Sequence, residues 1–290
     1  METIPKLALA SFLCDSGLAS LPQFPSNRPV SYLTAILLGV IEGLTEFLPV
    51  SSTGHLLIAE RWLPRQTDLF NVVIQTGAML AVLAVFWRRV VELLTDWRRP
   101  ETRSYLIKLA AAFFLTALGG IALKRLGFKL PKEVGPVAWA TLVGGFLILG
   151  IERFLRGKPG AEQPSWAVAF VAAGAQVLAA ACPGASRAGA TILFAMLAGL
   201  GRERATEFSF LLGLPTMFAA GALETFQALN GAGAEEARWG LVAVGTLASA
   251  VTAFAVVKWL LRFVQTHTFV VFGWYRIALG ALLLALARTN

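Results

Sequence analysis

Long runs of apolar residues separated by short basic segments are the feature that most restricts the fold of this chain. Six of these runs are each about 20 residues long, the length that a helix needs to cross the hydrocarbon core of a bilayer. They cover residues 70–87, 105–123, 136–154, 208–229, 239–261 and 269–287. Hydrophobic residues make up 57% of the chain and charged residues 14%, whereas a soluble domain is about half apolar and about a quarter charged. Since a segment in lipid must satisfy its backbone hydrogen bonds internally, we expect an all-α integral membrane protein with six transmembrane helices.

Two further apolar segments, 32–58 and 166–200, carry helix-breaking residues near their middles. Pro49 interrupts the first and Pro183 interrupts the second, and neither half of the first segment is long enough to span a bilayer alone. Irregular backbone within the membrane is tolerated only where it is buried in protein or lines a wet cavity. We therefore predict two re-entrant helix–loop–helix pairs, each entering and leaving the membrane on one side.

The two halves of the chain resemble each other around these breaks. Pro49 precedes Ser52 by three residues, Pro183 precedes Ser186 by three, and a glycine follows each motif. Each half would contain one re-entrant pair and three spans, and an odd number of spans inverts the second copy. Broken helices at matching places in inverted repeats point to a site near the middle of the membrane.

The predicted organisation is a single membrane domain over residues 29–290. Its first repeat covers about 29–155 and its second about 156–290. In the N-terminal residues 1–28, Lys6 precedes a short apolar run that resembles a signal peptide a little, but Asp15 interrupts the run. We expect these residues to form a tail outside the fold and assign them no function.

The formal net charge of +8 is explained first by the membrane. Lys and Arg cluster in short loops, where they set orientation and face anionic lipid; an anionic substrate is a second, weaker implication, and nucleic acid is not indicated. The Arg-rich segment 88–103 argues for the cytoplasm. With residues 88–103 in the cytoplasm, the basic segment 124–132 lies outside, which weakens this assignment of orientation. The same orientation opens the first re-entrant pair to the outer face. Two cysteines and two histidines are too few for a disulfide framework or a zinc site.

Two acids, Glu42 and Glu46, lie inside the first broken segment. Their spacing of four residues places both on one face of a helix. Ionisable groups at this depth are costly, so they indicate a functional site by default. The pair could form structural ion pairs or hydrogen bonds, could hold a hard divalent cation such as Mg²⁺ or Ca²⁺ through oxygen, or could supply a general base.

Hydroxyl groups and a histidine follow the two acids. Ser51, Ser52 and Thr53 are candidate nucleophiles or phosphate contacts, although each could simply cap the next helix. His55 is a candidate proton carrier. Gln75, on the next span, could supply an amide donor or could pack between helices.

The second broken segment carries an arginine among small residues. Arg187 is suited to grip phosphate oxygens in a bidentate manner, with snorkelling to the interface as the alternative. Gly184, Ser186, Gly189 and Thr191 surround it, and small neighbours let backbone N–H groups approach an anion. The helix that follows would point its positive end at the same place.

Together these groups suit the hydrolysis of a phosphoanhydride on a lipid. Arg187 and a cation would neutralise phosphate oxygens, Ser52 or a water would attack, and His55 or a glutamate would move protons. The candidate catalytic residues are Glu42, Glu46, Ser52, His55 and Arg187. The candidate substrate-binding residues are Ser51, Thr53, Gly54, Gln75, Gly184, Ser186, Gly189 and Thr191. A transporter of a lipid phosphate is the rival hypothesis, because inverted repeats with broken helices are also transporter architecture.

These motifs resemble the signatures of the undecaprenyl-diphosphate phosphatase family, the membrane enzymes linked to bacitracin resistance. The stretch 42–55, EGLTEFLPVSSTGH, is similar throughout to the first signature of that family. The stretch 183–191, PGASRAGAT, is similar to the second except at Ala188, and 70–77, FNVVIQTG, is similar to a third block except at Asn71. The resemblance covers residues from about 30 to the end.

This resemblance implies a multi-pass enzyme of the bacterial inner membrane that converts undecaprenyl diphosphate to undecaprenyl phosphate and inorganic phosphate. The product lipid is reused in cell-wall polymer synthesis. The resemblance also implies an inverted repeat with two re-entrant pairs and a site that opens to the periplasmic side. Partners would be the polyprenyl diphosphate and membrane lipids, with a homodimer left open, and the expected cofactor is Mg²⁺ or Ca²⁺ held by Glu42 and Glu46.

Overall fold

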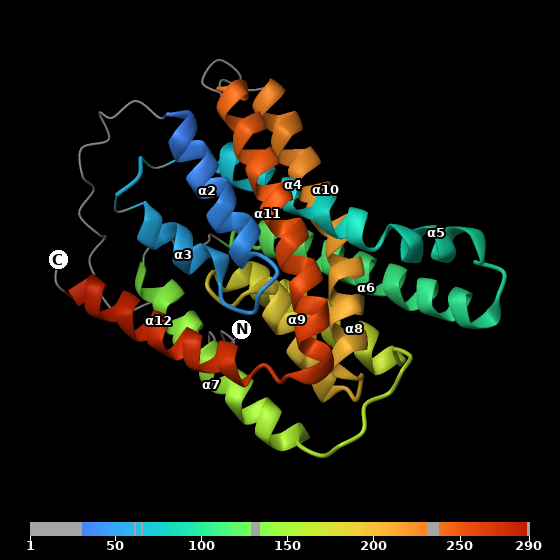
Figure 1. The fold of residues 1–290 in the computed structure, drawn as a ribbon. Coiled ribbons are helices and arrows are strands. Elements are labelled where there is room, and N and C mark those ends of the chain that lie inside the picture. The colour runs from blue at the N-terminus through green and yellow to red at the C-terminus, as the bar shows by residue number, and fades with distance from the viewer. Residues whose placement is uncertain (1–30, 61, 65, 129–133, 231–237, 289–290) are drawn as a thin grey trace, which may run out of the picture.

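The computed structural model describes residues 31–288 except 61, 65, 129–133 and 231–237 (Figure 1). The predictions made for the tail 1–28, and for the basic residues after 128, lie outside these described residues. Within them the chain forms eleven α-helices and a single isolated β-bridge between Ala161 and Leu200. The all-α prediction is therefore confirmed.

The helices follow one another with short connections. In chain order they are α2 (Tyr32–Thr45), α3 (Ser52–Ala59), α4 (Asp68–Val85), α5 (Trp87–Thr95), α6 (Pro100–Arg125), α7 (Val134–Leu155), α8 (Trp166–Ala181), α9 (Arg187–Leu197), α10 (Arg202–Asn230), α11 (Trp239–Thr266) and α12 (Val270–Arg288).

Five described helices are long and apolar enough to cross a membrane, namely α6, α7, α10, α11 and α12. Helices α4 and α5 add a sixth span if the bent pair is counted as one, with an angle of 69° between its halves. The sequence predicted that the span ending at Trp87 leads into a loop, and this is wrong over α5. Apolar residues such as Val90 and Leu93 alternate there with arginines at helical spacing, so one face of α5 packs while the other stays polar.

Both broken segments form pairs of short helices. Helix α8, the longest of the four with 16 residues, is roughly 24 Å long at about 1.5 Å per residue, which is less than the hydrocarbon thickness of about 30 Å. Helix α2 ends at Thr45, and α3 begins at Ser52 after a turn that contains Pro49. Helix α8 ends at Ala181, and α9 begins after a turn that contains Pro183.

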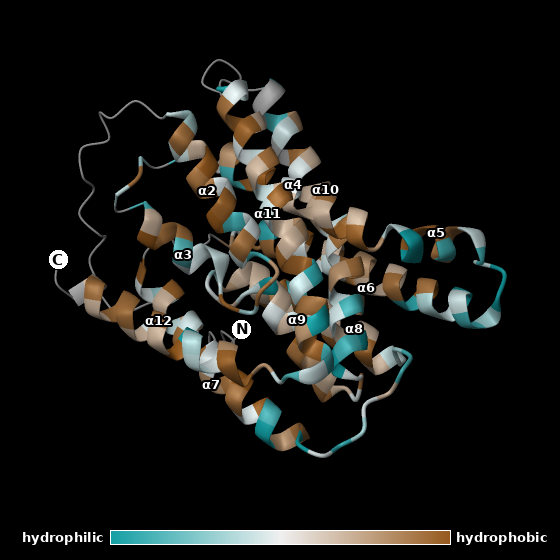
Figure 2. Ribbon diagram, viewed as in Figure 1, coloured by the Kyte–Doolittle hydropathy of each residue, from teal (hydrophilic) through white to brown (hydrophobic). Residues whose placement is uncertain are grey.

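The long helices pack against the four short helices of the broken segments. Helices α2 and α4 pack on α11, α8 and α10 pack on α6, and α7 packs on α12. A side chain at Gly145 would lie 2.7 Å from the carbonyl oxygen of Gly273 on α12, so this glycine lets α7 and α12 pack closely. Figure 2 shows apolar residues along most helices and hydrophilic residues in the segment between α5 and α6 and in that between α7 and α8.

Candidate active site

The two interrupted segments contain matching turns. Ser51 and Ser186 have φ values of 72° and 66°, and they are the only residues other than glycine with positive φ in the described part of the chain. Each caps the helix that follows: Ser51 Oγ accepts from Gly54 N at 3.4 Å, and Ser186 Oγ accepts from Gly189 N at 3.2 Å. Such backbone conformations cost about 1–3 kcal/mol each and cluster at functional sites.

The matching geometry corrects the register that the sequence suggested. Spacing from the prolines paired Ser52 with Ser186, but Ser51 is the residue that shares the conformation and cap of Ser186. Ser52 then corresponds to Arg187, because each is the first residue of its helix. The spacing from the prolines gave the wrong pairing because the turn is defined by the serine with left-handed backbone. The distance from proline does not reveal which residue adopts that conformation.

Glu46 is the point where the two turns meet. Its Oε1 accepts from Arg187 Nη2 at 2.9 Å, and its Oε2 accepts from Ser52 Oγ at 2.9 Å and from Gln75 Nε2 at 3.2 Å. The residue is buried. The structure thus joins an acid and a hydroxyl of the first motif, the arginine of the second motif and an amide from α4.

The guanidinium of Arg187 has hydrogen-bond donors that no described residue uses. Its Nη2 binds Glu46, while Nε and Nη1 are buried and find no hydrogen-bond partner among the described residues. A side chain at Gly213 on α10 would collide with this guanidinium, so the glycine leaves the room that Arg187 occupies. Buried donors without partners are costly, and an anionic ligand would satisfy them.

Glu42 lies beside Glu46 and is only 1% exposed. Both of its carboxylate oxygens are buried and accept no hydrogen bond of good geometry in the described part of the chain, and the Glu46 carboxylate and the Gln75 amide are their polar neighbours. A buried, unpaired carboxylate is strongly unfavourable, so this group requires a proton or a cation. The described residues include no group of three or more His, Cys, Asp or Glu side chains that could hold a metal, so a cation between these two acids would need further ligands from a substrate.

His55 faces α12 rather than the acidic pair. Its Nδ1 lies 2.7 Å from the Ser51 carbonyl oxygen, which can only accept, so Nδ1 carries the proton. Its Nε2 lies 2.6 Å from the Tyr275 hydroxyl, and the two rings are nearly parallel at 4°. Tyr275 could not be predicted as a partner of His55, since nothing local in the sequence links residues that are 220 positions apart.

The remaining candidates are placed around the turns with different roles. Thr53 is exposed at the start of α3. Thr191 is fully buried, and its hydroxyl donates to the Arg187 carbonyl oxygen at 2.8 Å, so it braces the helix rather than facing a ligand. Gly184 has φ +94°, which favours glycine, and contributes a carbonyl oxygen to the arginine described next.

Arg276 of α12 links both turns and was missed by the sequence analysis. It is 1% exposed, and all five of its N–H donors are used. They donate to the carbonyl oxygens of Pro49, Ala140, Thr141, Gly184 and Ala185 at 2.9–3.4 Å. Gly144 on α7 makes room for its guanidinium. An arginine inside the apolar run 269–287 was the available signal.

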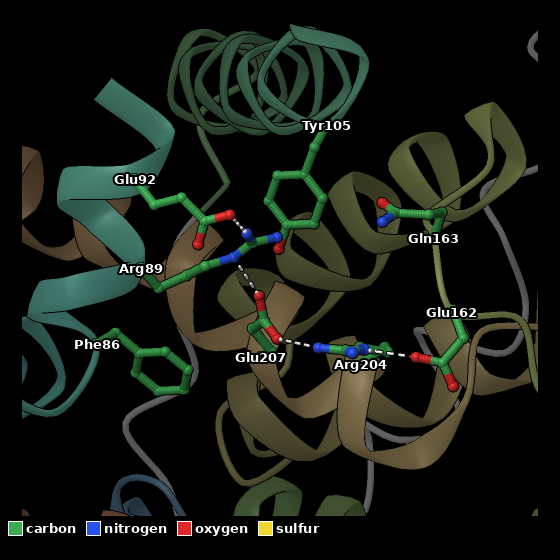
Figure 3. A pocket seen from close by; sticks show the side chains of 8 residues that line it. All are labelled: Phe86, Arg89, Glu92, Tyr105, Glu162, Gln163, Arg204 and Glu207. Carbon is green, nitrogen blue, oxygen red and sulfur yellow. Dashed lines mark hydrogen bonds and ion pairs between the residues drawn. The ribbon is translucent and has the colours of Figure 1, made fainter. Parts of the chain in front are cut away.

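A separate cavity of about 320 Å³ lies away from these residues, between α5, α6, α10 and the segment before α8. Figure 3 shows Arg89 between Glu92 and Glu207, and Arg204 between Glu207 and Glu162. None of the predicted site residues lines it. Its charges are paired with one another, which is typical of a structural ion-pair network.

Comparisons with known proteins agree with the motifs. A family model described as "Bacitracin resistance protein BacA" matches residues 35–282. A curated protein named "Undecaprenyl-diphosphatase" from Rhizobium etli is 47% identical over 262 residues, covering 90% of this chain and 99% of the relative. Proteins of the same name from Xylella fastidiosa and Xanthomonas oryzae pv. oryzae are 48% and 46% identical, each over 87% of this chain and over 97% and 96% of the relative.

Proposed function

The chain belongs to the BacA family of bacitracin resistance proteins, and we propose that it acts, like its curated relatives, as an undecaprenyl-diphosphatase. It is a multi-pass membrane enzyme that hydrolyses undecaprenyl diphosphate to undecaprenyl phosphate and inorganic phosphate. The observation that carries the assignment of its site is the convergence of Ser52 and Arg187 on Glu46, from motifs on different halves of the chain.

The fold proposed for this enzyme is an inverted repeat of six spans and two re-entrant pairs. If each helix of the first repeat is matched with its counterpart in the second, α2 corresponds to α8, α3 to α9, α4 to α10, α6 to α11 and α7 to α12. The observed packing follows this exchange, because α2 and α4 lie on α11 just as α8 and α10 lie on α6. The contact of α3 with α12 is likewise matched by that of α9 with α7. In this arrangement the α2–α3 pair opens to the periplasmic side of the inner membrane.

Arg187 binds the diphosphate. Its unsatisfied Nε and Nη1 donors, on two sides of the guanidinium, each supply a hydrogen bond to phosphate oxygens while Nη2 stays on Glu46. The N-terminal ends of α3 and α9 both start at the site, and their first N–H groups and dipoles favour the same charge. Positive ends of two helices and one guanidinium together stabilise the charge of the transferring phosphoryl group.

Ser52 is the nucleophile in this proposal, and Glu46 is its base. The Ser52 hydroxyl already donates to Glu46 Oε2 at 2.9 Å, which is within reach for proton transfer. Ser52 Oγ bonds to the terminal phosphorus, the bridging P–O bond breaks, and the serine proton passes through Glu46 to the undecaprenyl phosphate that leaves. Water then attacks the phosphoserine and gives a proton to the freed Glu46 carboxylate, which returns it to Ser52 Oγ as the P–Oγ bond breaks and inorganic phosphate is released.

Glu42 and Glu46 would hold a divalent cation, Mg²⁺ or Ca²⁺, together with substrate oxygens. The unpartnered oxygens of Glu42 beside Glu46 support this placement, since hard cations prefer carboxylate and phosphate oxygen. The ion would supply neutralisation of phosphate charge. His55 acts indirectly, because its two nitrogens engage Ser51 and Tyr275.

Phosphate release from purified protein and undecaprenyl diphosphate tests the proposal. We expect Glu46→Gln and Arg187→Ala each to reduce turnover by at least about 100-fold, which corresponds to about 2.7 kcal/mol of lost transition-state stabilisation. Glu101→Gln, a matched change of an exposed acid at the start of α6, should leave the rate unchanged. Binding and movement of polyprenyl phosphate without turnover would instead favour the transporter.

A further inference from the structure

A second cavity, of about 340 Å³, lies where α6 and α8 begin. Its lining consists of Arg98, Pro100, Arg103, Ser104, Ile107 and Trp166. We propose that it binds the phosphodiester headgroup of an anionic membrane phospholipid, a site distinct from the one that holds the substrate. None of the residues assigned to catalysis lines it.

The side chains that line this cavity include two arginines and no acid. Neither Arg98 nor Arg103 forms an ion pair among the described residues, and Arg98 only stacks over the Trp97 ring at 5.4 Å. Of the acids near them in the sequence, Asp96 is bound by Arg99, and Glu101 in the first turn of α6 does not line the cavity. By contrast, both arginines that line the cavity in Figure 3 are held by glutamates. The present cavity therefore has positive charge available for an external anion.

Further donors point to the same place. Ser104 Oγ, which lines the cavity, accepts from Nζ of Lys108 at 3.0 Å, so the serine hydroxyl is free to donate. Helix α6 begins at Pro100 and is 26 residues long, so its unpaired first N–H groups and its dipole also favour a phosphate. Two arginines, a hydroxyl and a helix end suit a phosphodiester.

An apolar surface continues from the cavity along the helices, as an acyl chain requires. Ile107, Phe114 and Leu118 are 45%, 62% and 62% exposed and lie on one face of α6 at helical spacing. Trp166 and Phe170 are exposed on α8, which packs on α6, and their rings stack at 5.8 Å. A tryptophan at the head of such a surface is typical of the membrane interface. A free phosphate would leave this apolar surface unused, whereas a lipid would cover it.

Lipid binding to the full chain tests the proposal, with native mass spectrometry in detergent as the measurement. Wild-type protein should bind phosphatidylglycerol at least about 10-fold more tightly than phosphatidylcholine. The double variant Arg98→Gln/Arg103→Gln should weaken phosphatidylglycerol binding by about 30-fold, since each basic residue near an anionic surface contributes roughly a fivefold factor. Phosphatase activity should persist, because the cavity contains none of the catalytic residues.

The matched control removes the same charge from the other end of the same helix. Lys124→Gln/Arg125→Gln changes two exposed cations in the last turn of α6 and should leave the preference for phosphatidylglycerol intact. An equal loss in both double variants would show a general charge effect and overturn the proposal. Equal binding of the two lipids by wild type would also overturn it, as would displacement of the lipid by submillimolar inorganic phosphate. Arg103→Gln alone, a change at an exposed position, repeats the test if the double variant fails to fold.

Discussion

Substitution of Arg276 by lysine tests how the two turns are held. The guanidinium donates five hydrogen bonds to five carbonyl oxygens, and three of those carbonyls belong to the turns. Lysine keeps the positive charge but has three donors on one nitrogen, so at least two carbonyls lose their partner. Each buried group left unsatisfied costs about 1–3 kcal/mol. The expected loss of stability is therefore roughly 2–6 kcal/mol, a large part of the stability of an ordinary domain.

Thermal unfolding in detergent and phosphate release measure the two consequences. We expect Arg276→Lys to lower Tm markedly and to reduce kcat, because Glu46 and Arg187 are aligned by turns that this residue ties together. Arg125→Lys, at an exposed position in α6, is the matched control and should change neither quantity. A variant with wild-type Tm and wild-type kcat would refute the reasoning, since it would show that the five bonds are not needed to hold the turns.

Four further outcomes are expected. Tyr275→Phe removes the hydroxyl bonded to the motif histidine while keeping the stacked ring, so kcat should fall about fivefold, as for the loss of one hydrogen bond of about 1 kcal/mol; Tyr32→Phe is the control, and an equal fall there would contradict the assignment. Ser52→Ala should reduce kcat far more than KM, because a transition-state contact is lost; a pure KM effect would make this serine a binding residue only. Excess chelator should stop turnover, and undiminished phosphate release would rule out the cation between the two acids. A cysteine at position 125 should react with an impermeant reagent from the periplasm and one at 98 should not, in a chain otherwise free of cysteine; the reverse labelling pattern would invert the proposed orientation.

Local patterns in the sequence predicted the class of fold and the depth of the reactive groups. The lengths of the apolar runs predicted the spans. Pro49 and Pro183 predicted the interrupted segments, because both kinds of feature act over only a few helical turns. The position of α5 was missed, since a short amphipathic helix rich in arginine reads like a basic loop. The motif residues Glu46, Ser52 and Arg187 could be chosen as candidates because buried ionisable groups are costly and rarely accidental.

The pairing of those groups was decided by tertiary packing alone. Glu46 and Arg187 are 141 residues apart in the chain, and only the packing of the two short helix pairs against the long spans brings their atoms within hydrogen-bond distance. The same packing turns His55 toward Tyr275 and places Arg276 against both turns. A sequence specifies the conformational preference of each segment and the polarity of each side chain. Contacts between distant segments depend in addition on the shapes of the packed surfaces and on glycines that leave room for a neighbouring side chain, such as Gly144 and Gly213. For that reason the chemistry of this protein could be anticipated from its residues, whereas the hydrogen bonds that organise the site required the folded arrangement.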